Sequence, residues 1–383
     1  MPRLLVLFSL INLVVGSGAF MLAGILSLVA EDLRVSVPVS GQAVTVYALS
    51  TAVLAPLLLV ATGRWPRKRA MLLALALFTV GNALCAAASS FAALLAGRAV
   101  MGVGAAFVPI AAGVAVAVVA PARRGQALAL VFLGMSLSYV VGLPLGAWLG
   151  FAQGWHAPVW AATAASALAF AAAAWFVPRQ IQAPGASFVG IGALLARGDV
   201  LVVLGMTLCY FTAIFTVFSY IGPVLNALVP MDGTRLSLTL MLFGISGVVG
   251  TLLGGAANDR FGPRPTLLSM LSMLLSMMAL LPLVAGHYAA MLTVMLVWGT
   301  AGFGMMAPQQ SRLAQMAPAQ APLLLSLNTS MLYFGTALGA VVGGAAVPML
   351  GFARLPWAGA PFVALGLLLF WRAHRPAVVK VSA

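Results

Sequence analysis

"GLPLGAWLG" at residues 142–150 and "GTALGAVVG" at residues 335–343 are the two stretches that decide the fold. In both, glycine recurs every fourth residue, so an α-helix would carry one smooth face along which another backbone can approach closely. The glycines of the two faces are Gly142, Gly146 and Gly150, and Gly335, Gly339 and Gly343. Two such helices far apart in one chain predict two similar halves that pack tightly and rock.

The composition places these helices in a membrane. Of the 383 residues, 63% are hydrophobic and 6% are charged, and the mean hydropathy is +1.13. An ordinary soluble domain has about 25% charged residues. Apolar stretches of about 20 residues, each long enough to cross about 30 Å of hydrocarbon, recur along the whole length. We predict twelve spans, at residues 4–29, 40–62, 70–88, 92–117, 126–150, 157–176, 201–225, 237–257, 266–285, 289–311, 322–349 and 357–373.

The basic residues indicate an orientation rather than a nucleic-acid surface. The net charge is +14, and an even number of spans puts both termini on one side. With the termini inside, 15 Lys and Arg lie on the inner face and 3 on the outer face, while Arg98 falls within a span. Positive loops resist translocation. We therefore expect a multi-pass protein of the inner (cytoplasmic) membrane with both termini in the cytoplasm and no nucleic-acid partner.

A second repeat divides the chain into halves. The longest polar connection, 177–199, falls between the sixth and seventh spans. "VATGRWPRKRAMLLALAL" after span two matches "GAANDRFGPRPTLLSMLS" after span eight, so that Arg64 falls on Arg260 and Lys68 on Arg264. We predict an N-terminal six-helix bundle at 1–176, a cytoplasmic central loop at 177–200 and a C-terminal six-helix bundle with a short tail at 201–383. Two pseudo-symmetric bundles around a central cavity are the architecture of alternating-access transporters.

Several motifs resemble those of a known family. They are "LLAGRAVMGVGAA" (94–106), "GMSLSYVVGLPLGAWLG" (134–150), "FTVFSYIGPVL" (215–225) and "SLNTSMLYFGTALGAVVGG" (326–344). Together they resemble the major facilitator superfamily, and more closely its twelve-helix drug:proton antiporter family, in the arabinose-efflux-like and purine-efflux-like branch. The resemblance implies the major facilitator fold, and a packing motif in span five formed by Gly134, Gly142, Pro144, Gly146 and Gly150.

The resemblance also implies a latch at the inner gate. The family's loop signature has an Asp before Arg64, where this chain has Gly63, whereas the second copy of the loop keeps Asp259. We therefore expect Asp259, with Arg260 and Arg264, to carry more of the latch in this chain.

Arg98 is the one permanent charge inside an apolar run. Such a charge costs about 2.5–3.5 kcal/mol at a helix centre, so it normally faces a cavity or a partner. The side chain could reach the outer interface, roughly 9 Å away; it could form a structural ion pair; or it could bind substrate or couple transport. Glu31 and Asp32, at the outer end of span one, could form a protonatable pair with Arg98, because an adjacent arginine lowers a carboxyl pKa. Alternatively, they form a solvated helix end.

Neutral polar and aromatic residues within the spans are candidates for the substrate cavity, and each is equally compatible with packing or an interhelical hydrogen bond. They are Asn12, Gln42, Tyr47, Tyr139, Tyr210, Phe211, Phe215, Tyr220, Asn328 and Tyr333. An aromatic and amide lining with one cation suits neutral, amphipathic or weakly anionic solutes better than cationic drugs.

The sequence carries no signature of an enzyme, a metal site or an ATP-driven pump. No HExxH, Gly-x-Ser-x-Gly or paired carboxylates occur in any span, and no Walker motif is present. We predict no enzyme activity, cofactor or metal. The leading prediction is a monomeric secondary transporter that exports a small organic solute or drug in exchange for protons. The alternatives are an uncoupled facilitator or importer of a sugar-like or nucleoside-like solute, and a non-transporting receptor or scaffold.

Overall fold

The computed structural model describes residues 2–120, 123–179, 181, 190–317 and 320–372, and the regular secondary structure of these residues is helical. Twelve segments in this part of the chain are long and apolar enough to cross a membrane. The predicted all-helical membrane fold with twelve spans is therefore confirmed. Part of the predicted central loop, the tail from residue 373, and the predicted inner-face residues Arg375 and Lys380 lie outside the described residues.

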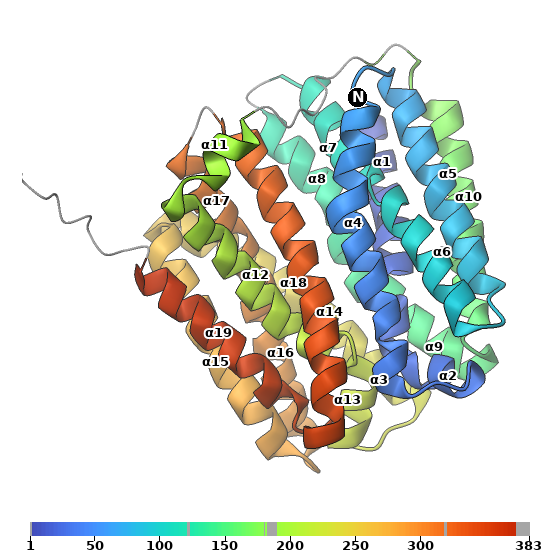
Figure 1. Cartoon of the computed structure of the whole chain (residues 1–383), viewed down its shortest axis with the longest axis vertical. Coiled ribbons are helices and arrows are strands. Elements are labelled where there is room, and N and C mark those ends of the chain that lie inside the picture. The colour runs from blue at the N-terminus through green and yellow to red at the C-terminus, as the bar shows by residue number, and fades with distance from the viewer. Residues whose placement is uncertain (1, 121–122, 180, 182–189, 318–319, 373–383) are drawn as a thin grey trace, which may run out of the picture.

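The first six spans gather on the right in Figure 1. In chain order their helices are α1 (Pro2–Phe20), η1 (Met21–Gly24), α2 (Leu26–Asp32), α3 (Val37–Ser40), α4 (Gln42–Ala61), α5 (Arg67–Ala86), α6 (Phe91–Gly104), α7 (Phe107–Ala117), α8 (Arg124–Leu137), η3 (Ser138–Gly142), α9 (Leu143–Gln153) and α10 (His156–Phe176). We call these elements the N-half.

The last six spans gather on the left in Figure 1. They consist of α11 (Ile191–Leu195), α12 (Gly198–Phe218), α13 (Ile221–Leu228), α14 (Gly233–Phe261), α15 (Pro263–Leu280), η4 (Leu281–Val284), α16 (Tyr288–Gly304), α17 (Met306–Met316), α18 (Ala321–Leu350) and α19 (Leu355–Arg372). We call these elements the C-half. We call the end of the molecule with α2, α3 and α13 the α2–α13 end, and the opposite end the N-terminal end.

Three spans break where a proline stands in the first turn of a new helical segment. Pro109 is the third residue of α7, Pro144 the second of α9 and Pro308 the third of α17. Proline has no N–H to donate to the preceding turn, so it is tolerated where a helix begins and disrupts the ladder before it. In span five the disrupted turn is the π-helical segment η3, which contains Tyr139. Such turns occur frequently at functional sites.

The glycine face of span five packs against the first span of its own half. A methyl group on Gly134 would overlap the carbonyl oxygen of Ser9 in α1, and one on Gly146 would lie 2.9 Å from the Met21 side chain in η1. Gly142 and Gly150 contact the same span in the same way. These glycines are required because larger residues would push the two backbones apart.

The glycine face of span eleven makes the equivalent contact in the C-half. Methyl groups on Gly335 and Gly339 would lie 2.7 and 2.6 Å from the carbonyl oxygens of Leu208 and Thr212 in α12. Span eleven therefore packs on span seven as span five packs on span one, which is the predicted pseudo-symmetry. The faces hold each half together. Our expectation that they form the surface on which the halves rock is corrected, because their partners lie within the same half.

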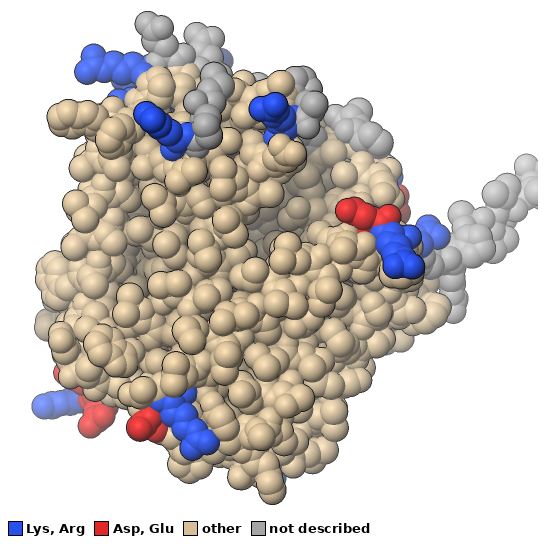
Figure 2. All heavy atoms as spheres, turned by 180° about the vertical axis from the view of Figure 1, so that it is seen from behind, with Lys and Arg blue, Asp and Glu red and all other residues tan. Residues whose placement is uncertain are grey.

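Charged side chains gather at the two ends of the molecule, and Figure 2 shows a broad uncharged belt between them. All five acids are exposed. Large apolar side chains are exposed between the ends, including Leu168 (71%), Leu283 (67%) and Leu368 (61%). A belt of this kind faces lipid, since exposed apolar side chains are stable only in a bilayer.

Candidate functional site

Tyr220, between α12 and α13, seals the two halves together at the α2–α13 end. Its side chain is fully buried, and its hydroxyl donates toward the carbonyl oxygens of Ala340 in α18 (2.9 Å) and Pro38 in α3 (3.2 Å). Glycines make room for the ring: a methyl group on Gly41 would overlap the hydroxyl, and one on Gly344 would lie 2.7 Å from it. Because Pro38 and Gly41 belong to the N-half, this notch exists only while the halves are together.

Backbone contacts extend this seal. A methyl group on Gly222 of α13 would overlap the carbonyl oxygen of Gly24 in η1, and one on Gly24 would lie 3.3 Å from Leu240 of α14. Farther along α14, a methyl group on Gly244 would overlap the carbonyl oxygen of Tyr139 in η3. Two of the contacts between the halves thus lie where an N-half helix departs from regular α-helix.

Toward the N-terminal end, the helical segments pack chiefly within their own half. α7 packs on α1, α5 and α8, and α17 packs on α12, α14, α15, α16 and α18. Exposure also rises along the helices toward the N-terminal end. In α4 the exposed fraction is 1% at Tyr47 and 49% at Leu57, and in α14 it is 2% at Phe243 and 68% at Leu252. The halves are joined at the α2–α13 end and part toward the N-terminal end.

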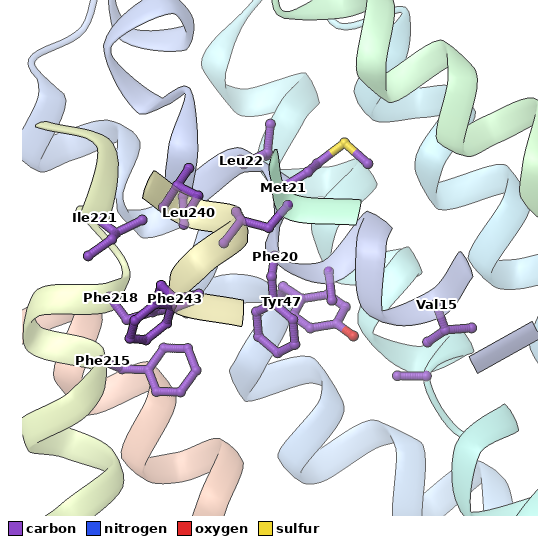
Figure 3. Close-up of a cluster of buried hydrophobic side chains, with 14 of the residues drawn as sticks. Val15, Phe20, Met21, Leu22, Tyr47, Phe215, Phe218, Ile221, Leu240 and Phe243 are labelled. Atoms are coloured by element: carbon purple, nitrogen blue, oxygen red, sulfur yellow. The ribbon is translucent and has the colours of Figure 1, made fainter. Parts of the chain in front are cut away.

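An aromatic cluster joins the halves next to this seal. We call it the central aromatic cluster; it comprises Phe20, Tyr139, Phe215, Phe218, Phe243 and Phe303. Phe20 stacks on Tyr139 within the N-half, with ring centroids 5.0 Å apart. Tyr139 then contacts Phe303 edge-on at 4.8 Å and Phe218 at 5.7 Å, both in the C-half. Figure 3 shows Phe215, Phe218 and Phe243 beside Phe20.

Arg98 lies inside the N-half and binds backbone carbonyls. Its side chain is 1% exposed. Nη1 and Nη2 donate to the carbonyl oxygens of Gly18 (3.0 Å) and Ala19 (2.8 Å) in α1, and Nε donates to that of Ala43 in α4 (3.1 Å). The guanidinium also lies 4.7 Å from the ring centre of Tyr47. Gly18 and Ala19 are in the last turn of α1, where carbonyls lack a full set of α-helical partners and carry negative partial charge. Arg98 therefore caps a helix that ends within the membrane.

The predicted pair between Arg98 and Glu31 or Asp32 is not formed in this structure. Both carboxylates are exposed at the end of α2, and Asp32 instead accepts a hydrogen bond from Trp155 Nε1 at 2.9 Å. The prediction failed because Arg98 donates to backbone carbonyl oxygens, which every residue carries, and not to a side-chain carboxylate. The burial of Arg98 also argues against the interpretation that its side chain reaches the outer interface.

A chain of polar side chains connects three spans of the C-half. Gln309 Nε2, in α17, donates to the carbonyl oxygen of Val203 and to Thr207 Oγ1, both at 2.8 Å. Thr207 Oγ1, in α12, donates in turn to Asn328 Oδ1 in α18 at 2.6 Å. Gln309 Oε1 is buried without a partner. Because the Val203 carbonyl can only accept, the amide nitrogen must face it, which leaves this acceptor available for a donor.

The other predicted cavity residues divide into buried and half-buried groups. Asn12 is fully buried, and its amide donates to the Val131 carbonyl at 2.9 Å, so it joins α1 to α8 rather than facing a cavity. Tyr210 is buried, and its hydroxyl lies 3.9 Å from the sulfur of Met306. This group also includes Tyr47, Phe215, Tyr220 and Asn328.

The half-buried group contains the candidates best placed to meet a solute. It consists of Gln42, Tyr139, Phe211 and Tyr333. Tyr333 lies in α18, which packs against α4 of the N-half. Phe211 stacks on Phe215 at 6.0 Å, which extends the central aromatic cluster along α12.

The predicted latch residues lie at the N-terminal end and are exposed. Asp259 contacts the side-chain amide of Asn258 at 3.5 Å, and Arg260 lies over the ring of Phe261 at 5.3 Å. Within the described residues, the one ion pair joins Arg197 to Asp199, so the latch is not closed. Arg264 is also exposed. Arg312, one of the Lys and Arg residues predicted on the inner face, is 8% exposed within α17.

Comparison with known proteins agrees with this geometry. The model of the Major Facilitator Superfamily matches residues 8–321 and 231–383. The chain belongs to the Major Facilitator Superfamily. The inner membrane transport protein YdhP of Escherichia coli K12 is 30% identical over 363 residues, covering 94% of this chain and 93% of YdhP. A probable sugar efflux transporter of Mannheimia succiniciproducens is 28% identical over 353 residues, covering 92% and 88%.

The solved structures show the same fold. A bacterial homologue of the human lysosomal transporter Spinster, in an inward-facing and unoccupied conformation, superposes with a TM-score of 0.80 at 14% identity, covering 97% of this chain and 96% of the other. The family prediction is therefore confirmed. This facilitator-superfamily protein is a multi-pass inner-membrane transporter and not an enzyme.

Sequence reasoning missed several residues of the site. Phe20, Phe218, Phe243 and Phe303 were not candidates, because an apolar ring in an apolar span carries no signal of its own. Pro144 offered a signal for η3, since a proline within a span marks a departure from regular helix. Gln309 could have been found in the same way as Asn328, as a lone amide within a span.

Proposed function

We propose that the protein exports a small organic solute by alternating access, in exchange for protons. The observation that carries this proposal is the seal around Tyr220. The halves close on each other at the α2–α13 end and part toward the N-terminal end. A protein that closes one end in this way can expose a central site to one side of the membrane at a time.

The chemistry between the halves favours a neutral or weakly anionic substrate with an apolar part. The central aromatic cluster offers ring faces and edges, and the half-buried Tyr333 and Gln42 add neutral polar groups. All five acids are exposed, so the membrane core lacks the carboxylate that a cationic drug would require. The Mannheimia relative is a probable sugar efflux transporter, which supports export of a hydroxylated solute.

We base proton coupling on Asp32. Asp32 is held to Trp155 at the start of α10, at the sealed end. α2, which carries Asp32, packs against α13 of the C-half, so separation of the halves at this end changes the surroundings of this carboxylate. The remaining parts of the proposal are a monomer, both termini in the cytoplasm, and a latch at Asp259 that closes the N-terminal end in the opposite conformation.

Solute-driven proton movement tests the proposal in proteoliposomes that contain a pH-sensitive dye. Sugars, nucleosides and amphipathic drugs are screened against the wild type, Asp32→Asn and Asp232→Asn. Asp232 is the matched control, because it is an exposed acid at the same end whose side chain caps α14 through Arg235 N, and asparagine caps equally well. We expect proton movement in the wild type and Asp232→Asn but not in Asp32→Asn. Solute flux without proton movement would instead indicate an uncoupled facilitator, and no flux of any solute would contradict transport.

A further inference from the structure

A surface pocket lies on the outside of the N-half, away from the contact between the halves. It has a volume of about 670 Å³ and lies where the first turn of α5 meets the last turn of α10. Its lining consists of Lys68, Phe170, Ala171, Ala174, Trp175, Val177, Pro178 and Arg179. The transport mechanism does not use this pocket.

Two cations line this pocket. Lys68 Nζ donates one hydrogen bond, to the carbonyl oxygen of Ala174 at 2.6 Å, which leaves two of its three N–H groups for another acceptor. Arg179 is exposed. No carboxylate lines the pocket. The N-terminus of α5, which carries positive partial charge and has no side-chain cap, adds to this potential.

The wall of the pocket is apolar and continues onto the surface that faces lipid. Phe170, Ala171 and Ala174 lie along α10, whose outer residues Leu168 and Phe176 are 71% and 69% exposed. Trp175 is 85% exposed at the end of the span, where tryptophan sits at the level of lipid headgroups. A ligand that fills this pocket therefore meets cations at one side and an apolar wall at the other.

We propose that this pocket binds an anionic phospholipid, with the headgroup phosphate between Lys68 and Arg179 and an acyl chain along α10. Basic pockets beside transmembrane helices recognise anionic headgroups, and each nearby cation contributes about 1 kcal/mol. A soluble phosphate would use the same cations but would leave the apolar wall uncovered. The continuous apolar wall therefore favours the lipid.

Native mass spectrometry of the full chain in detergent tests this assignment, with phosphatidylglycerol and phosphatidylcholine of identical acyl chains as probes. We expect tighter binding of phosphatidylglycerol, weakened about 5-fold by Lys68→Gln or Arg179→Gln and about 30-fold by both together. Arg69→Gln is the matched control, because Arg69 is an exposed neighbour of Lys68 outside the pocket lining. The thermal unfolding of each variant is measured to confirm that it folds.

A second measurement places the lipid in the pocket. Phosphatidylglycerol with brominated acyl chains should quench tryptophan fluorescence in the wild type more than in Trp175→Phe. The assignment is overturned if both lipids bind equally, or if the double variant binds phosphatidylglycerol as Arg69→Gln does. It is also overturned if glycerol 3-phosphate displaces the lipid at equal concentration, because the occupant would then be a soluble phosphate.

Discussion

Gly41→Ala should open the seal at the α2–α13 end. The added methyl group would overlap the hydroxyl of Tyr220, which is buried in the notch between Gly41 and Gly344. Overpacking of a buried site costs about 1–3 kcal/mol, and loss of the hydrogen bond to Pro38 costs about 1 kcal/mol. Both costs arise only while the halves are together. The sealed conformation should therefore be destabilised by about 2–4 kcal/mol. This shifts the equilibrium between the sealed and separated conformations about 30-fold to 1,000-fold toward the separated one.

Distances between spin labels on the two halves measure this shift. Val39 in α3 and Thr234 in α14 are exposed near this end and can carry the labels, while the native Cys85 and Cys209 are buried. The wild type should show one short distance, and Gly41→Ala should show a longer one. The control is Gly255→Ala, since nothing lies within 4 Å of an added methyl group there. Identical distance distributions in Gly41→Ala and the control would refute the notch as the seal.

Three further predictions concern stability. Arg98→Met should lower the free energy of unfolding by at least about 3 kcal/mol, because each of three carbonyls left without its donor costs about 1 kcal/mol. Arg98→Lys should lower the free energy of unfolding less. Equal melting temperatures of the wild type and Arg98→Met would contradict the capping role. Gly134→Ala should lower the melting temperature because its methyl group overlaps Ser9, whereas Gly113→Ala, which has open space, should not. Gln309→Leu should lower the melting temperature, because it removes the hydrogen bonds to the Val203 carbonyl and to Thr207, each of which contributes about 1 kcal/mol; an unchanged melting temperature would contradict this role.

The fold could be predicted because its signals are properties of single segments. Each span must be long and apolar to cross a bilayer, so the predicted span 40–62 corresponds closely to Val37–Ala61 in the structure. The glycine faces were equally visible. Their partners were not, because a smooth face shows that some helix approaches without showing which one. Only the structure reveals that Gly134 meets α1 within the same half.

The site was harder to predict than the fold for a related physical reason. The sequence marks Arg98 as a buried charge that needs a partner, and a search for acids then leads to Glu31 and Asp32. The actual acceptors are the carbonyl oxygens of Gly18, Ala19 and Ala43. Every residue has such a group, and only their place in the last turn of α1 distinguishes Gly18 and Ala19.

In the alternating-access cycle proposed above, the burial of Arg98 without a carboxylate would make the protein sensitive to the membrane voltage. A positive charge fixed within one half is separated from each aqueous side by part of the membrane field, and that part changes when the opening moves from one side to the other. Moving one charge across a membrane potential of 100 mV changes its energy by about 2.3 kcal/mol, so a change of half that potential drop contributes about 1.2 kcal/mol. In that cycle, the resting potential of the cell would bias the direction in which the empty transporter faces.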